Sequence, residues 1–133
     1  MKSIASLTHA PEFEICSVHW KGTELSFWCK VLTAKEHRQV TDYFSKDGNV
    51  DLSKYREQAD AFVSSCVYVD ASSMPDSKRP VIEFTDSDGE KHEVRQWLSK
   101  GEAGELKAAL LDKIRTAVEK VNSLKQPEEL GNE

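Results

Sequence analysis

The sequence lacks any long hydrophobic run. Of its 133 residues 38% are hydrophobic and 31% are charged, and no apolar stretch approaches the roughly 20 residues that a membrane-spanning helix needs. Residues 1–11 contain isolated Ile4 and Leu7 but no continuous apolar segment, so we expect no signal peptide. A basic excess is lacking too, because 18 Lys and Arg stand against 23 Asp and Glu. Since phosphate-binding surfaces need clustered cations, we expect neither a nucleic-acid partner nor a membrane.

Cysteine is scarce. Cys16, Cys29 and Cys66 leave one thiol unpaired under any disulfide scheme, which is typical of a reducing, intracellular compartment. Cys16 and His19 lie three apart on a predicted strand and face opposite ways, so a zinc site that adds Cys29 and His37 is not favoured. We expect reduced thiols that act as small core hydrophobes. Cys16 and Cys29 would face each other only if the hairpin loop had four residues.

The motifs of familiar catalysts are missing as well. The sequence contains no G-x-S-x-G elbow, no Walker glycine loop and no H-E-x-x-H helix. Its carboxylates are spread along the chain, and no acid–base pair stands out. We therefore predict a non-enzymatic protein with no catalytic residue, no metal ligand and no cofactor.

One acidic stretch, "FTDSDGEKHEV" at residues 84–94, comes closest to a metal loop. If Gly89 takes the sixth place of a calcium loop, Asp86 and Asp88 fall at the third and fifth. The first and twelfth places are then Phe84 and Arg95, which do not bind calcium. An Asp-Gly turn is the better interpretation, because glycine accepts a positive φ at little cost.

What is present is a mixture of strand and helix patterns, which predicts an α+β fold: a small antiparallel sheet with an N-terminal hairpin, packed with three to four helices. "FEICSVHW" and "TELSFWCKV" alternate on either side of Lys21-Gly22, as in a hairpin. Thr33 and Glu36 form a capping box. The helix that follows them is predicted to continue through Val40, Tyr43 and Phe44.

Three further helical segments are predicted after residue 50. One helix begins near Ser53 and turns an apolar stripe to the core: Tyr55, Ala59, Phe62, Val63 and Cys66. The Asp-Gly turn leads into one or two helical turns indicated by Val94, Trp97 and Leu98 and stopped by Gly101 and Gly104. The last helix carries the stripe Leu106, Leu110, Ile114, Ala117, Val121 and Leu124. We expect a flexible lead (1–12), a single α+β domain (13–124) and a flexible acidic tail (125–133).

Large apolar side chains are the candidate partner-binding residues. Trp28 falls on the strand face opposite Leu25 and Phe27, among polar neighbours. It is either covered by a helix of its own chain or offered to a partner. The candidate partner-binding residues are Trp28, Trp97, Leu106 and Leu110.

Three segments carry a resemblance: "VHWKGTELSFWCKV" running into "LTAKE", then "QADAFVSSCVYVD", and then "PVIEFTDSDGEKHEVRQWLSKGEAGELKAALLDKIRTAVEKVN". Over about residues 13–124 the chain resembles the tail assembly chaperones of long-tailed, siphovirus-type bacteriophages and prophages.

The resemblance implies a protein that binds the tape-measure protein, recruits tail-tube subunits and offers no catalytic residues. From its apolar helix faces we also expect weak self-association. It would act in the host cytoplasm, stay out of the mature virion and in many members also occur as a longer, frameshifted product. The alternatives are a generic acidic adaptor or secretion-type chaperone, and a minor phage structural protein.

Overall fold

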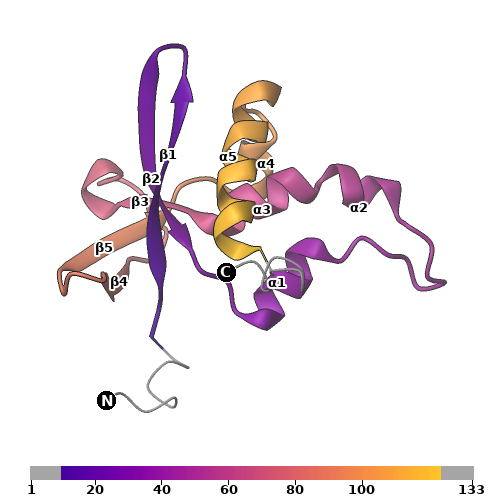
Figure 1. The fold of residues 1–133 in the computed structure, drawn as a ribbon, viewed down its shortest axis with the longest axis horizontal. Coiled ribbons are helices and arrows are strands. Elements are labelled where there is room, and N and C mark those ends of the chain that lie inside the picture. The colour runs from indigo at the N-terminus through magenta and orange to yellow at the C-terminus, as the bar shows by residue number, and fades with distance from the viewer. Residues whose placement is uncertain (1–9, 124–133) are drawn as a thin grey trace, which may run out of the picture.

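The structure, a computed structural model, describes residues 10–123. Over these residues the chain forms a five-stranded antiparallel sheet with five α-helices, which confirms the predicted α+β class and its N-terminal hairpin (Figure 1). Two of the five helices are very short. Most of the predicted lead and the whole predicted tail lie outside the described residues. The strands are β1 (Phe13–Trp20), β2 (Thr23–Lys30), β3 (Val67–Asp70), β4 (Ile82–Thr85) and β5 (Lys91–Gln96).

The β1–β2 hairpin has a two-residue loop. Trp20 pairs with Thr23, and both Lys21 and Gly22 have positive φ, of 50° and 80°. A loop of this kind matches the right-handed twist of the flanking strands. The resulting register pairs Cys16 with Phe27, so Cys16 and Cys29 do not stand opposite each other.

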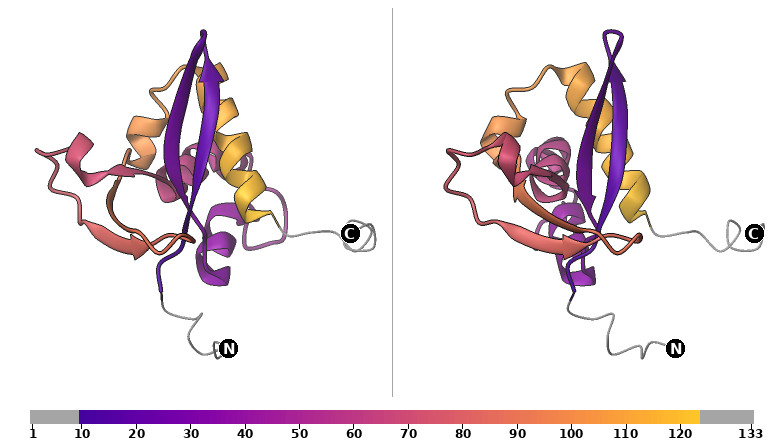
Figure 2. Two further views of the ribbon diagram at one scale, coloured as in Figure 1. Left: turned by 60° about the vertical axis from the view of Figure 1, so that its left-hand side comes forward. Right: turned by 90° about the vertical axis from the view of Figure 1, so that its left-hand side faces the viewer.

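The strands follow the order β1-β2-β3-β5-β4, and the two faces of the sheet are covered differently. Helices cover one face, where Phe27, Cys29 and Val67 pack against buried residues of α3 (Gln58–Cys66) and α5 (Ala108–Asn122). The other face has no helix over it among the described residues. There the sheet curls, the β4–β5 hairpin crosses the lower half of β1–β2 (Figure 2), and aromatic side chains form a second small core.

The first helix, α1 (Ala34–Thr41), starts as predicted. Thr33 Oγ1 accepts a hydrogen bond from the Glu36 N–H, and the Glu36 carboxylate accepts one from the Thr33 N–H. The helix ends at Thr41, however, so the predicted continuation through Tyr43 and Phe44 is wrong. Phe44 instead makes an isolated bridge to Val50.

The predicted second helix is divided in two. α2 (Leu52–Arg56) is capped by Asp51, and α3 begins after Glu57. Tyr55, predicted to face the core, is exposed, because α2 lies beyond the body that α3 and α5 build. α3 ends at Cys66, and the chain passes directly into β3, a strand that the sequence patterns did not predict.

The C-terminal half contains one clear error of prediction. The Asp-Gly turn joins β4 to β5. Val94, predicted to begin a helical turn, lies in β5, and the chain from Trp97 to Leu98 is irregular rather than helical. A short helix, α4 (Lys100–Ala103), follows from a capping box at Ser99, so Gly101 lies inside a helix that it was expected to stop.

The last helix, α5, begins at Ala108, and Leu106 precedes it. Leu124, the last member of the predicted stripe, lies outside the described residues. No helix within residues 10–123 is long and apolar enough to cross a membrane.

Candidate functional site

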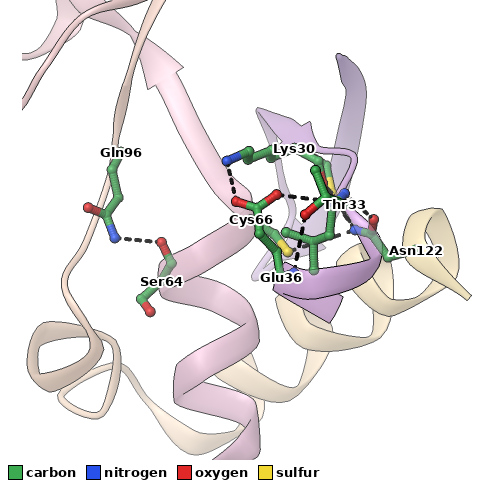
Figure 3. Close-up of polar contacts among 9 residues, drawn as sticks. Lys30, Thr33, Glu36, Ser64, Cys66, Gln96 and Asn122 are labelled. Atoms are coloured by element: carbon green, nitrogen blue, oxygen red, sulfur yellow. Dashed lines mark hydrogen bonds and ion pairs between the residues drawn. The ribbon is translucent and has the colours of Figure 1, made fainter. Parts of the chain in front are cut away.

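Polar side chains join the end of β2 to α3 and α5 (Figure 3). Asn122, on α5, is buried. Its Oδ1 accepts a hydrogen bond from the Leu32 N–H at 2.8 Å, and its Nδ2 donates to the Lys30 carbonyl at 3.0 Å. The same Nδ2 lies 3.7 Å from the sulfur atoms of Cys29 and Cys66. These bonds satisfy the backbone where the chain leaves the sheet, which is a structural role.

Lys30 and Glu36 form an ion pair at 2.6 Å beside this junction. Burial, the largest single influence, would by itself lower the pKa of Lys30, but the hydrogen bond and charge of Glu36, together with smaller electrostatic contributions from Tyr68 and Cys66, outweigh burial, and the pKa is raised. Burial would likewise raise the pKa of Glu36, yet the bonds from Lys30 and Thr33 lower it. Both groups therefore stay charged at neutral pH, and neither is poised for proton transfer.

The three thiols lie near one another under the helices. Cys29 and Cys66 are fully buried and Cys16 is partly buried. Burial raises the pKa of Cys16 to about 12. A hydrogen bond with Cys66, together with burial, raises the pKa of Cys29 still further from its ordinary range. Because the thiolate is the reactive form, these are core thiols rather than nucleophiles.

Asp86, Glu90 and His92 meet at the β4–β5 turn, and their ligand atoms lie within 4.8 Å of one another. The three residue types are those that bind divalent cations. Asp86, however, already has partners. Its Oδ1 accepts hydrogen bonds from the N–H groups of Asp88 and Glu90, and its Oδ2 lies 2.6 Å from His92 Nε2. The hydrogen bond with His92 is the main reason that the pKa of Asp86 is lowered. The cluster accounts for the shape of the turn.

The predicted partner-binding residues are not brought together. Trp97, Leu106 and Leu110 pack, partly buried, against the helix-covered core. Trp28 lies on the opposite face, as the strand alternation predicted. Its ring contacts the rings of Phe84 and His92, and its Nε1 donates to Asp70 at 3.2 Å. Trp28 is thus covered by strand residues of its own chain rather than by a helix.

A surface that the sequence analysis did not identify lies between α1 and α3. Of seven large hydrophobic side chains exposed among the described residues, four fall in the stretch 44–55, with exposed fractions between 48% and 61%. We call them the apolar patch: Phe44, Val50, Leu52 and Tyr55. Figure 1 shows this connection and α2 at the end of the molecule farthest from the sheet. Exposed apolar patches on soluble domains commonly mark interaction sites.

A second surface is a cleft of about 490 Å³ between the start of β1 and the β4–β5 turn. Its lining combines apolar side chains with carboxylates: Glu12, Phe13, Glu14, Ile15, Trp28, Thr85, Asp86, Ser87 and Asp88. Ile15 is 62% exposed there, beside its cross-strand partner Trp28. No sequence pattern could reveal this cleft, because its two walls lie about 70 positions apart in the chain.

Comparisons of the chain with protein-family models, with curated proteins and with solved structures find no match.

Proposed function

We propose that this protein is a non-enzymatic tail assembly chaperone of a long-tailed bacteriophage or prophage. In this role it binds the tape-measure protein and helps to recruit tail-tube subunits in the cytoplasm of the bacterial host, without being retained in the virion. The observation that carries the proposal is the apolar patch. It offers two aromatic and two aliphatic side chains, each about half exposed, on a segment that projects from the body.

The patch suits the binding of an amphipathic helix. Such a helix lays apolar residues spaced three and four apart into a partner's apolar surface. Tyr43 packs against the patch: its ring centroid lies 5.5 Å from that of Phe44 and 5.4 Å from that of Tyr55. A long helical protein that aggregates by itself would gain solubility by covering its apolar stripe in this way.

Co-expression with the tape-measure protein encoded nearby tests the proposal. We expect the wild-type chain to keep that protein soluble and the double variant Phe44→Ser/Leu52→Ser to lose most of this effect. Val81→Ser is the matched control, since Val81 is 43% exposed outside the patch. Equal solubility of the tape-measure protein with and without the chain would contradict the chaperone role.

The two alternatives predict other outcomes. A generic acidic adaptor or secretion-type chaperone would be encoded away from tail genes and would not solubilise the tape-measure protein. A minor structural protein would be detected by mass spectrometry in purified mature particles, where a chaperone is absent.

A further inference from the structure

We propose that the cleft between β1 and the β4–β5 turn binds an extended, positively charged segment of a partner protein, with Arg or Lys side chains alternating with apolar ones. The cleft is a different surface from the apolar patch, and the inference does not depend on the chaperone role.

The charge of the lining indicates the charge of the occupant. Glu12, Glu14, Asp86 and Asp88 supply four carboxylates, and none of the nine lining residues is Lys or Arg. Asp86 keeps its charge because hydrogen bonds lower its pKa, and the largest contribution comes from His92. A single-sign rim around a recess attracts an opposite charge and excludes partners of the same charge.

The apolar part of the cleft lining explains why the segment must also carry apolar side chains. Ile15 and Trp28 are directly paired across β1 and β2, and both line the cleft. Trp28 is held in place, because its indole N–H donates to Asp70 and its ring packs on Phe84. A guanidinium or ammonium group near the rim can also lie over the indole, an interaction that favours cations.

The position of β1 explains why the segment would be extended. β1 is an edge strand of the sheet, and such an edge presents backbone N–H and C=O groups that another strand can pair with. At the far end of β1, Lys113 of α5 reaches the His19 carbonyl at 3.0 Å. Near the start of β1, Glu14 and Ile15 line the cleft. In a paired strand alternate side chains point the same way, so the charged ones would meet the rim together.

The test uses the full chain, labelled with ¹⁵N, and two acetylated peptides, Arg-Val-Arg-Val-Arg and its counterpart with citrulline in place of arginine. Citrulline keeps the shape of arginine and removes its charge. We expect the arginine peptide to shift the Trp28 indole resonance and the amides of residues 12–15 and 85–88. The citrulline peptide should bind at least about tenfold more weakly, and added salt should weaken the arginine peptide.

Two charge-matched variants complete the test. Glu14→Gln/Asp88→Asn removes two exposed carboxylates from the cleft, and Asp76→Asn/Glu105→Gln removes two exposed ones elsewhere. Only the first should lose affinity for the arginine peptide. Equal binding of both peptides, shifts that avoid the cleft, or an equal loss in both variants would overturn the inference.

Discussion

Asn122, near the end of the last helix, binds the backbone of Leu32, 90 positions earlier, through a hydrogen bond of 2.8 Å. The same side chain donates to the Lys30 carbonyl. One amide therefore satisfies both a donor and an acceptor where the chain leaves β2 for α1, and it fixes α5 against the sheet.

Replacement of Asn122 by alanine should lower the free energy of unfolding by about 2–3 kcal/mol, because it leaves two backbone groups without their partner. Urea denaturation followed by circular dichroism measures the change. Ser123→Ala is the control: the exposed Ser123 hydroxyl donates to the Lys120 carbonyl of its own helix, and the change should stay within about 0.5 kcal/mol. A similar loss in both variants would refute the role of Asn122.

The glycines at positions 89 and 101 should respond in opposite directions to alanine. Gly89 has φ of 84° in the β4–β5 turn, and Gly101 lies inside α4; an added Cβ meets nothing within 4 Å at either place. Only the backbone conformation then decides the outcome. Gly89→Ala should destabilise the fold by about 1 kcal/mol, whereas Gly101→Ala should stabilise it by up to about 1 kcal/mol.

Thermal unfolding of both glycine variants and the wild type measures this difference. A stabilised Gly89→Ala variant would mean that the turn does not adopt the left-handed conformation. A destabilised Gly101→Ala variant would mean that Gly101 ends a helix, as its sequence context first indicated.

Local signals in the sequence predicted local structure well. The alternation around Lys21-Gly22, the Thr33–Glu36 capping box and the Asp88-Gly89 turn each specify a conformation through neighbouring residues. The α+β class and the helix at residues 108–122 followed from hydrophobic periodicity.

Features that depend on distant partners were missed. Strand β5, "KHEVRQ", is largely polar, and it is a strand because β3 and β4 pair with both its edges. Tyr55 continues the apolar spacing of α3, yet a break at Glu57 removes it from the core. The cleft needs β1 and the β4–β5 turn together, which no short sequence window contains.

The thiols should be almost unreactive in the native protein. Burial raises the pKa of Cys16 to about 12 and, with the Cys66 hydrogen bond, raises the pKa of Cys29 further. Because only the thiolate attacks a disulfide reagent, Ellman's reagent near neutral pH should label the folded chain slowly and all three thiols rapidly in urea.

Ser26→Cys provides the control for this measurement, because Ser26 is exposed on β2. The variant should gain one rapidly reacting thiol without unfolding. Rapid labelling of the wild-type chain in the absence of urea would show that the helices open readily over the sheet.

The stabilising effect of Asp86 should depend on pH. Its pKa is lowered, first by the hydrogen bond from His92 and then by the N–H groups of Glu90 and Asp88. A carboxyl group whose folded pKa is depressed stabilises the fold above its unfolded pKa of about 3.9 and loses that effect as the pH falls through the lower, folded value. The wild type should therefore have a higher urea midpoint than Asp86→Asn near pH 7, and the difference should shrink below about pH 3.9.

Asp88→Asn removes the exposed carboxylate two positions on, and its urea midpoint should differ less from that of the wild type at every pH. A difference between wild type and Asp86→Asn that stays constant down to the acid transition would mean that the charge of Asp86 does not stabilise the turn.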